Sequence, residues 1–370
     1  MYSKIKLFLA FTLLLACHSG KAQWDKYSIN FSIRPGFIVP HHSYMNYFLT
    51  ENVNAMQLNF GFTPNGDKYW HSDYNYPIIG LGIHYSGLGN DSLYGKLTGL
   101  YFFMNRFFLD NNKRFNIGNT LSVGLSYASK WYNLESNRVN MILSTPLNVF
   151  FQYDIGITYR LKKNHTISSS IGFAHASNGS VKEPNLGFNI LTTSLGYRYS
   201  FGQTSSPPEV HPEDKTPHFL WNFGFFGSIK SINAFTGKQY GVFGFSAENL
   251  YRLAPLSMIG LEFTAYKDNS IPQEILEEND ITSPLNSNEN IAIAINASYL
   301  MGFDRVSIAF QPGIYLRNQF YGFGAITNKI GLRIRVYQGL SFTIAIKAHW
   351  VAQADFVELG IKYSLTQNEK

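Results

Sequence analysis

The sequence of 370 residues has one cysteine, few charged residues and, beyond its first residues, no long apolar segment. The single cysteine, Cys17, lies near the N-terminus, so no disulfide can stabilise the rest of the chain. Charged residues make up 15% of the chain and form no basic run, which excludes the electrostatic footprint of a nucleic-acid-binding protein. The lack of a long apolar segment excludes a transmembrane helix after the N-terminal region.

The N-terminal segment has the pattern of an export signal. Two lysines precede a short apolar stretch, Leu7–Ala16, which is too short to cross a bilayer as a helix. Two processing sites compete, lipidation at Cys17 and cleavage before Gln23. We favour cleavage before Gln23 because an integral barrel needs no lipid anchor, and we predict a signal peptide over residues 1–22. Its three lysines leave with it, which lowers the formal net charge from +6 to +3.

The rest of the chain is rich in aromatic residues, at 16%, and contains 31 glycines. Apolar and polar residues alternate in many runs of about ten residues, which end in Gly, Asn, Asp or Pro. A soluble β-sandwich also alternates. Export, aromatic content and run length together favour an all-β fold, an antiparallel β-barrel in the bacterial outer membrane.

Sixteen candidate strands form two groups of eight. A polar, proline-rich linker, residues 202–217, separates a unit at 23–201 from a unit at 218–370. The units close on similar words, "LGYRYSF" and "LGIKYSL", which indicates an internal duplication. The pattern leaves open whether the halves form two small barrels or one of sixteen strands. The strands are predicted to begin near Tyr27, Val53, Tyr76, Ser92, Ile117, Asn148, His165, Gly187, His218, Lys238, Ser257, Ile291, Asp304, Ala325, Leu340 and Asp355.

The stretch "FAHASNGS" ends the seventh predicted strand. His175 and Ser177 share the parity of Ile171 and Phe173, so they belong to the lipid-facing side of the strand. Asn189 has the lipid-facing parity of the eighth strand and lies near its outer end. Polar residues on that face are costly unless they lie at the interface or have a function.

These three residue types can form a hydrolytic site. A base must take the serine proton before the hydroxyl can attack an ester, and a third group must orient the imidazole. His175 would be the base, Ser177 the nucleophile and Asn189 the orienting group, with a substrate in the outer leaflet. The alternative is that "HASN" simply opens a loop, with Asn178-Gly179 as a turn.

The segment "HASNGSVKEPNLGFN", His175–Asn189, followed by "LGYRYSF", resembles the lipid A 3-O-deacylases (PagL), a family of acyloxyacyl hydrolases. The resemblance covers the N-terminal half. It implies an eight-stranded outer-membrane barrel that removes an ester-linked acyl chain from lipid A, with His175 as base and Ser177 as nucleophile. It also implies an oxyanion donor at Asn178 or Asn185. No cofactor or metal is expected.

One position departs from that family, which has glutamate where this chain has Asn189. An asparagine there resembles the outer-membrane phospholipases A, which need calcium. Lys182 stands where an acidic calcium ligand would be expected, so we do not carry the metal over. The expected partner is therefore lipid A (lipopolysaccharide) or, as the alternative, a phospholipid. A non-enzymatic pore or structural barrel is the rival from another class, and the oligomeric state, a homodimer included, is left open.

The other histidines singled out in the sequence are interpreted as structural or loop residues. His349 ends the fifteenth strand with inward parity, and we predict a lumenal polar network there with Lys347, Glu358 and Lys362. His41, His42, His71 and Asp73 fall in early loops, where loop polarity explains them and no ligand set is complete.

Overall fold

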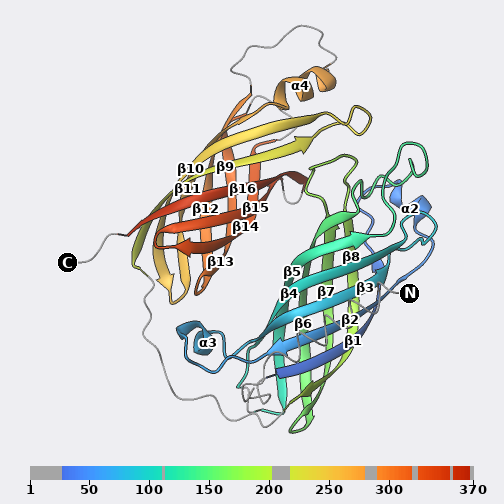
Figure 1. Ribbon diagram of the computed structural model, residues 1–370, viewed down its shortest axis with the longest axis vertical. Helices are drawn as coiled ribbons and strands as arrows, with labels where there is room; N and C mark the ends of the chain where they lie inside the picture. The colour runs from blue at the N-terminus through green and yellow to red at the C-terminus, as the bar shows by residue number, and fades with distance from the viewer. Residues whose placement is uncertain are drawn as a thin grey trace, which may run out of the picture.

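The computed structural model describes residues 27–110, 113–201, 217–279, 290–318, 324–350 and 353–366, and all further statements concern these. It forms two closed antiparallel β-barrels of eight strands each, which lie side by side (Figure 1). Pairing of Ser28 with Ser200 closes the first barrel, and pairing of Trp221 with Leu365 closes the second. The choice left open by the sequence is thus settled as two barrels.

The first barrel contains eight strands and two short helices in its connections. Its elements are β1 (Tyr27–Ile38), α2 (Met45–Phe48), β2 (Val53–Phe62), α3 (Tyr69–Asp73), β3 (Ile78–Gly87), β4 (Lys96–Phe107), β5 (Phe115–Ala128), β6 (Leu147–Lys162), β7 (His165–Ser177) and β8 (Phe188–Ser200).

The second barrel repeats the same meander with one helix. Its elements are β9 (Phe219–Ser231), β10 (Gln239–Ala254), β11 (Ser257–Asp268), α4 (Ile271–Asn279), β12 (Ile291–Phe303), β13 (Val306–Arg317), β14 (Ile326–Tyr337), β15 (Leu340–His349) and β16 (Gln353–Thr366). Each predicted strand start lies within four residues of an observed one. The predicted signal peptide and nearly all of the predicted linker lie outside the described residues. None of the described helices is long and apolar enough to cross a membrane.

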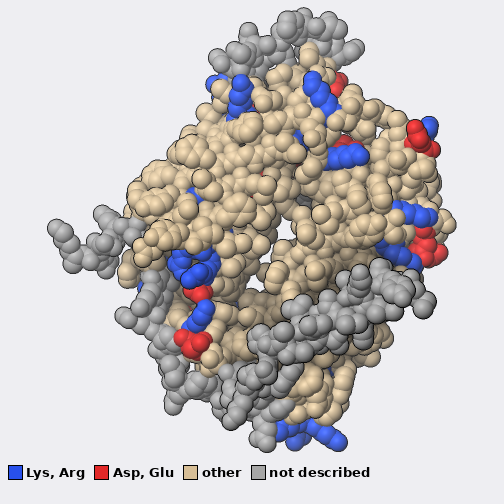
Figure 2. Space-filling view, in the orientation of Figure 1, with Lys and Arg blue, Asp and Glu red and all other residues tan. Residues whose placement is uncertain are grey.

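Alternation along the strands gives each barrel an apolar outer surface. On β7, for example, Ile171 is 64% exposed and Phe173 is 39% exposed, whereas Ala174 and Ala176 face inward and are buried. Figure 2 shows broad areas of this face with few charged side chains, most of which lie toward the edges of the view. An apolar exterior stabilises a barrel in lipid, because no water is available there to solvate polar side chains.

The interior of the first barrel is polar and charged around Arg34 and becomes apolar toward one end. Arg34 forms an ion pair with Asp154 and donates hydrogen bonds to Gln57 Oε1 (3.2 Å) and Thr192 Oγ1 (3.1 Å), which satisfies the buried charge. Toward the end that carries the longer loops, the interior is apolar. The largest fully buried side chains there are those of Tyr94, Tyr101, Phe150, Phe188, Met45, Leu88, Leu97, Ile142, Leu143 and Ile190.

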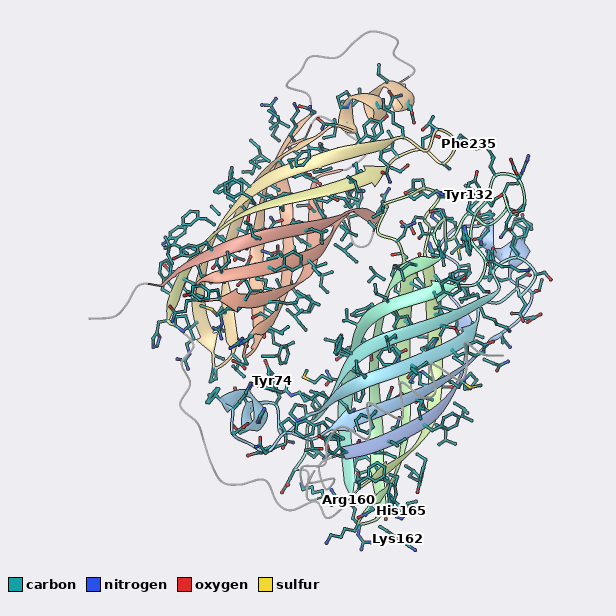
Figure 3. The ribbon with its side chains drawn as sticks, in the orientation of Figure 1. Tyr74, Tyr132, Arg160, Lys162, His165 and Phe235 are labelled. Carbon is teal, nitrogen blue, oxygen red and sulfur yellow. The ribbon has the colours of Figure 1, made fainter. Side chains whose placement is uncertain are left out.

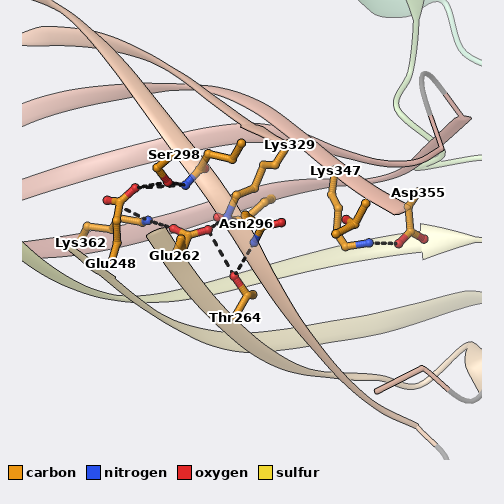
Figure 4. A network of polar contacts seen from close by, with 12 residues as sticks. Glu248, Glu262, Thr264, Asn296, Ser298, Lys329, Lys347, Asp355 and Lys362 are labelled. Atoms are coloured by element: carbon orange, nitrogen blue, oxygen red, sulfur yellow. Dashed lines mark hydrogen bonds and ion pairs between the residues drawn. The ribbon is translucent and has the colours of Figure 1, made fainter. Parts of the chain in front are cut away.

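The interior of the second barrel is filled by ion pairs (Figure 4). Glu248 accepts two hydrogen bonds from Arg333, at 2.5 and 2.8 Å, and Glu262 pairs with Lys329 at 2.5 Å and with Lys362. Each buried carboxylate thus has a cation and further polar partners, which a charge inside a protein requires.

The lumenal network predicted around His349 is present in part. His349 and Lys347 do face inward, but they share Asp355, with nitrogen–oxygen distances of 3.0 Å for each. Glu358 instead contacts Lys329, at 3.4 Å. The sequence did not predict that Asp355 belongs to this network. The β15–β16 pairing shifts register between Lys347 and Ala348, and this irregularity near the start of β16 has no signature in the sequence.

The two ends of each barrel differ. Most connections after odd-numbered strands are long, and most after even-numbered strands are short; outer-membrane barrels place long loops outside the cell and short turns in the periplasm. In Figure 3, Tyr132 and Phe235 mark the long-loop end, and Arg160 and Lys162 mark the short-turn end of the first barrel. The β2–β3 connection is an exception, because it is long and contains α3 yet lies at the short-turn end.

The barrels contact each other at both ends. At the short-turn end, α3 and its flanks meet the β12–β13 turn: Lys68 Nζ lies 2.6 Å from Asp304 Oδ2, and Tyr74 donates to the Gly302 carbonyl at 3.1 Å. The Tyr74 ring also packs on Phe303, with centroids 4.8 Å apart. At the long-loop end, the contact is made by the β7–β8 connection, residues 178–187, against β9 and β16. The long β2–β3 connection thus reaches the second barrel and contacts it.

Candidate active site

Three polar side chains meet at the long-loop end of β7 and β8. His175 and Asn189 are directly opposite each other in the β7–β8 ladder, and His175 Nδ1 lies 2.7 Å from Asn189 Oδ1. His175 Nε2 lies 2.9 Å from Ser177 Oγ. Because an amide oxygen only accepts, Nδ1 carries the proton and Nε2 is left free to accept from the serine hydroxyl. This is the arrangement of a nucleophile, a base and an orienting group.

The strand pleat places these residues on the outer face of the barrel. His175 has the parity of the exposed Ile171 and Phe173, and Asn189 has that of the exposed Leu195. Ser177 is nevertheless only 3% exposed, because the β7–β8 connection covers it. The three side chains thus belong to the wall of the barrel and not to the residues that line its lumen.

A fourth residue, His41, completes the surroundings of the asparagine. His41 Nδ1 lies 3.3 Å from Asn189 Nδ2, and His41 Nε2 lies 2.8 Å from the Leu186 carbonyl. One tautomer fits both contacts, with Nε2 donating and Nδ1 accepting from the amide. His41 therefore fixes which way the Asn189 amide faces. This contact could not be predicted from the sequence, because His41 is 148 residues from Asn189 and lies in an irregular loop.

The two candidate oxyanion donors differ in their remaining hydrogen-bonding capacity. The side-chain amide of Asn178 donates to Ser144 Oγ (2.9 Å) and to the Lys182 carbonyl (2.8 Å), which uses both of its hydrogens. Asn185 Oδ1 accepts from the backbone N–H of Asn178 at 2.9 Å, whereas its Nδ2 has no partner among the described residues. Of the two, Asn185 is the side chain with a donor to spare.

Glu183 supports Asn185 and does not contact His175 in any hydrogen bond of the described residues. Its Oε2 accepts from the Asn185 backbone N–H at 2.8 Å. Burial raises the pKa of the Glu183 carboxyl above its usual range, while the bond from Asn185 and the charge of Lys230 act in the opposite direction. Glu183 thus contacts the backbone of the loop, whereas the side chain in contact with His175 Nδ1 is that of Asn189.

Gly187 allows the loop to pass directly over the catalytic candidates. Its φ is +74°, and a Cβ there would lie 2.9 Å from His175 Cε1 and 3.2 Å from Ser177 Cβ. Glycine tolerates both the left-handed conformation and the close approach.

We expect Gly187→Ala to lower the turnover number by about 10²-fold, because displacing a reacting group by about 1 Å can cost that much. The measurement is the initial rate of ester hydrolysis with purified protein in detergent. Gly237→Ala is the matched control, since Gly237 also has a positive φ (+60°) but has nothing within 4 Å of its Cβ position. Equal rates for the two variants would contradict close packing of the loop on His175.

Among the described residues, no group of three or more His, Cys, Asp or Glu side chains could hold a metal ion. What the arrangement can do chemically is take a proton from Ser177 and hold the resulting imidazolium against an amide oxygen. That is the chemistry of acyl transfer.

The fold and its apolar exterior define an integral barrel protein of the outer membrane, with a candidate hydrolytic site at one end. Residues 54–198 match the family model described as lipid A 3-O-deacylase (PagL), and residues 219–368 match that described as the C-terminal domain of acyloxyacyl hydrolase. The chain therefore belongs to the PagL and acyloxyacyl hydrolase family, as its sequence suggested for the N-terminal half.

Solved structures give weaker likenesses. The outer-membrane enzyme PagL is 17% identical over 46% of this chain and 98% of its own, with a TM-score of 0.30. Neisserial surface protein A (NspA) is 10% identical over 47% of this chain and 97% of its own, with a TM-score of 0.32. The family models, and not these likenesses, support the assignment. No curated protein matches the chain in a sequence search.

Proposed function

We propose that this protein is a lipid ester hydrolase that removes an ester-linked acyl chain from lipid A on the outer face of its first barrel. The observation that supports it most is the pair of contacts at His175, 2.9 Å to Ser177 Oγ and 2.7 Å to Asn189 Oδ1. The substrate class comes from the family that matches the same barrel. Phe151, opposite His175 in the ladder, and the exposed Phe173 offer apolar surface for an acyl chain.

In this mechanism Ser177 Oγ attacks the ester carbonyl while His175 Nε2 takes its proton. The tetrahedral oxyanion is held by loop donors, for which the spare Asn185 amide is the candidate. Collapse breaks the bond to the sugar oxygen, which receives the proton from His175 and leaves as an alcohol. Water, deprotonated by His175, then hydrolyses the acyl–serine ester and releases the fatty acid.

Mass spectrometry of lipids from cells that express the protein tests the substrate. We expect lipid A to lose the mass of one acyl chain, and no change with the Ser177→Ala variant. Accumulation of lysophospholipid with intact lipid A would instead support a phospholipase, the alternative that Asn189 favours because those enzymes use asparagine as the third residue. No change in either lipid would support a non-enzymatic barrel.

A further inference from the structure

The β7–β8 connection is fixed at two points that belong to different barrels. Near its end, the backbone N–H groups of Leu186 and Gly187 donate to the carbonyls of Met141 (3.4 Å) and Ile142 (2.9 Å), which belong to the first barrel. Near its start, Ser180 is bound to the second barrel. Between the two points lie the residues that surround the nucleophile.

The attachment to the second barrel is made by backbone and side chain together. The Ser180 carbonyl accepts from the Ser231 N–H of β9 at 3.0 Å, and Ser180 Oγ donates to the Ala354 carbonyl of β16 at 2.9 Å. The Gln239 side chain also donates to the Val181 carbonyl, at 3.4 Å. Ser180 is held at φ +62°, a conformation that a serine adopts only when its surroundings impose it.

Gly179 lets the two barrels approach each other at this point. Its φ is +66°, and a Cβ there would lie only 2.4 Å from Val357 Cγ2 of β16. Gly179 is two residues after Ser177, and the residue between them, Asn178, is bound to Asn185 through its N–H. A displacement at Gly179 is therefore passed on to both the nucleophile and the loop donor.

We propose that the second barrel is a positioning domain for the active site of the first: β9 and β16 hold Gly179 and Ser180 so that the β7–β8 connection stays in register over Ser177. The proposal rests on the proposed function. No serine lies two residues after His349, so the second barrel has no equivalent of the His175–Ser177 pair. In this scheme the second barrel contributes to the reaction without contacting the substrate. Gly179 and Ser180 are positioning residues in this scheme.

The test is a double-mutant cycle across the two barrels, measured with full-length protein in detergent and lipid A as substrate. Gly179→Ala should lower kcat about 10- to 100-fold with little change in KM, because it presses the loop against Val357. Val357→Ala alone should be close to wild type. The double variant should recover at least about tenfold in kcat, because the second substitution removes the methyl group that the new Cβ meets.

Three further variants keep the test decisive. Ser180→Ala removes the bond to Ala354 and the hydroxyl contact with Glu183, and it should lower kcat about 2- to 10-fold even if Gly179→Ala does not fold. Gly237→Ala is the control for strain from a positive φ, because no atom lies within 4 Å of its Cβ position. Lys68→Ala removes the ion pair with Asp304 at the other contact between the barrels. Both variants should leave kcat unchanged. If Ser177→Ala is inactive but Ser180→Ala and Gly179→Ala have normal kcat, or Val357→Ala gives no recovery, the positioning role is overturned and the proposed function stands. Full activity of Ser177→Ala would overturn both.

Discussion

Ser177→Ala and His175→Ala are each expected to lower the turnover number for lipid ester hydrolysis by about 10⁴-fold or more. In a serine protease, loss of the nucleophile or of the base costs about 2 × 10⁶, and no other described side chain is placed to replace either group here. The barrel should still fold, because both substitutions leave the backbone ladder of β7 and β8 intact. The measurement is fatty acid release from lipid A by mass spectrometry, with heat-modifiable gel mobility as the check on folding.

The same strand supplies matched controls. Ser169 is an exposed serine on the outer face of β7, and His165 is a histidine on that face whose Nδ1 lies 2.5 Å from the hydroxyl of Tyr197. Ser169→Ala and His165→Ala should keep wild-type rates. Loss of activity in the controls as well would point to a general effect of outer-face polarity and against a specific site.

Asn189→Ala is expected to lower the turnover number by about 10²- to 10³-fold. Loss of the orienting aspartate in the same protease costs about 3 × 10⁴, and a neutral amide stabilises an imidazolium less than a carboxylate does, so its removal costs less. Asn189→Glu should be tolerated or improve the rate if the site accepts the glutamate found in related deacylases. Initial rates over a range of lipid A concentrations check both outcomes.

Glu183→Gln is the control for the asparagine series. The new amide oxygen can still accept from the Asn185 N–H, so the loop should keep its conformation and the enzyme its rate. A silent Asn189→Ala together with an inactive Glu183→Gln would transfer the orienting role to the loop carboxylate.

Alternation predicted most of the architecture, because the two-residue period of a strand is a local property. It located all sixteen strands and assigned Ile171, Phe173 and Leu195 to the outer face. Closure is not a local property. The contact between β1 and β8 joins residues such as Ser28 and Ser200, and the same pattern would suit a strand of a larger barrel.

The residues of the candidate site also fall into two groups, those that strand periodicity predicted and those that it did not. His175, Ser177 and Asn189 were found together because they lie on adjacent strands, where parity and register fix the distances. His41 and Gly187 were not found, because each reaches the site from an irregular segment with no period to follow. The packing of Tyr74 on Phe303 could not be predicted from the sequence either, because the two residues lie in segments that are far apart in the chain.

Attachment at both ends limits how the two barrels can move in the bilayer. Two bodies held by several contacts at each of two separate places resist sliding along the membrane normal and drifting apart. Figure 2 shows openings near the middle of the molecule in this view, between the attachments. Any change in the gap between the barrels would therefore have to come from rotation about the line through the two attachments.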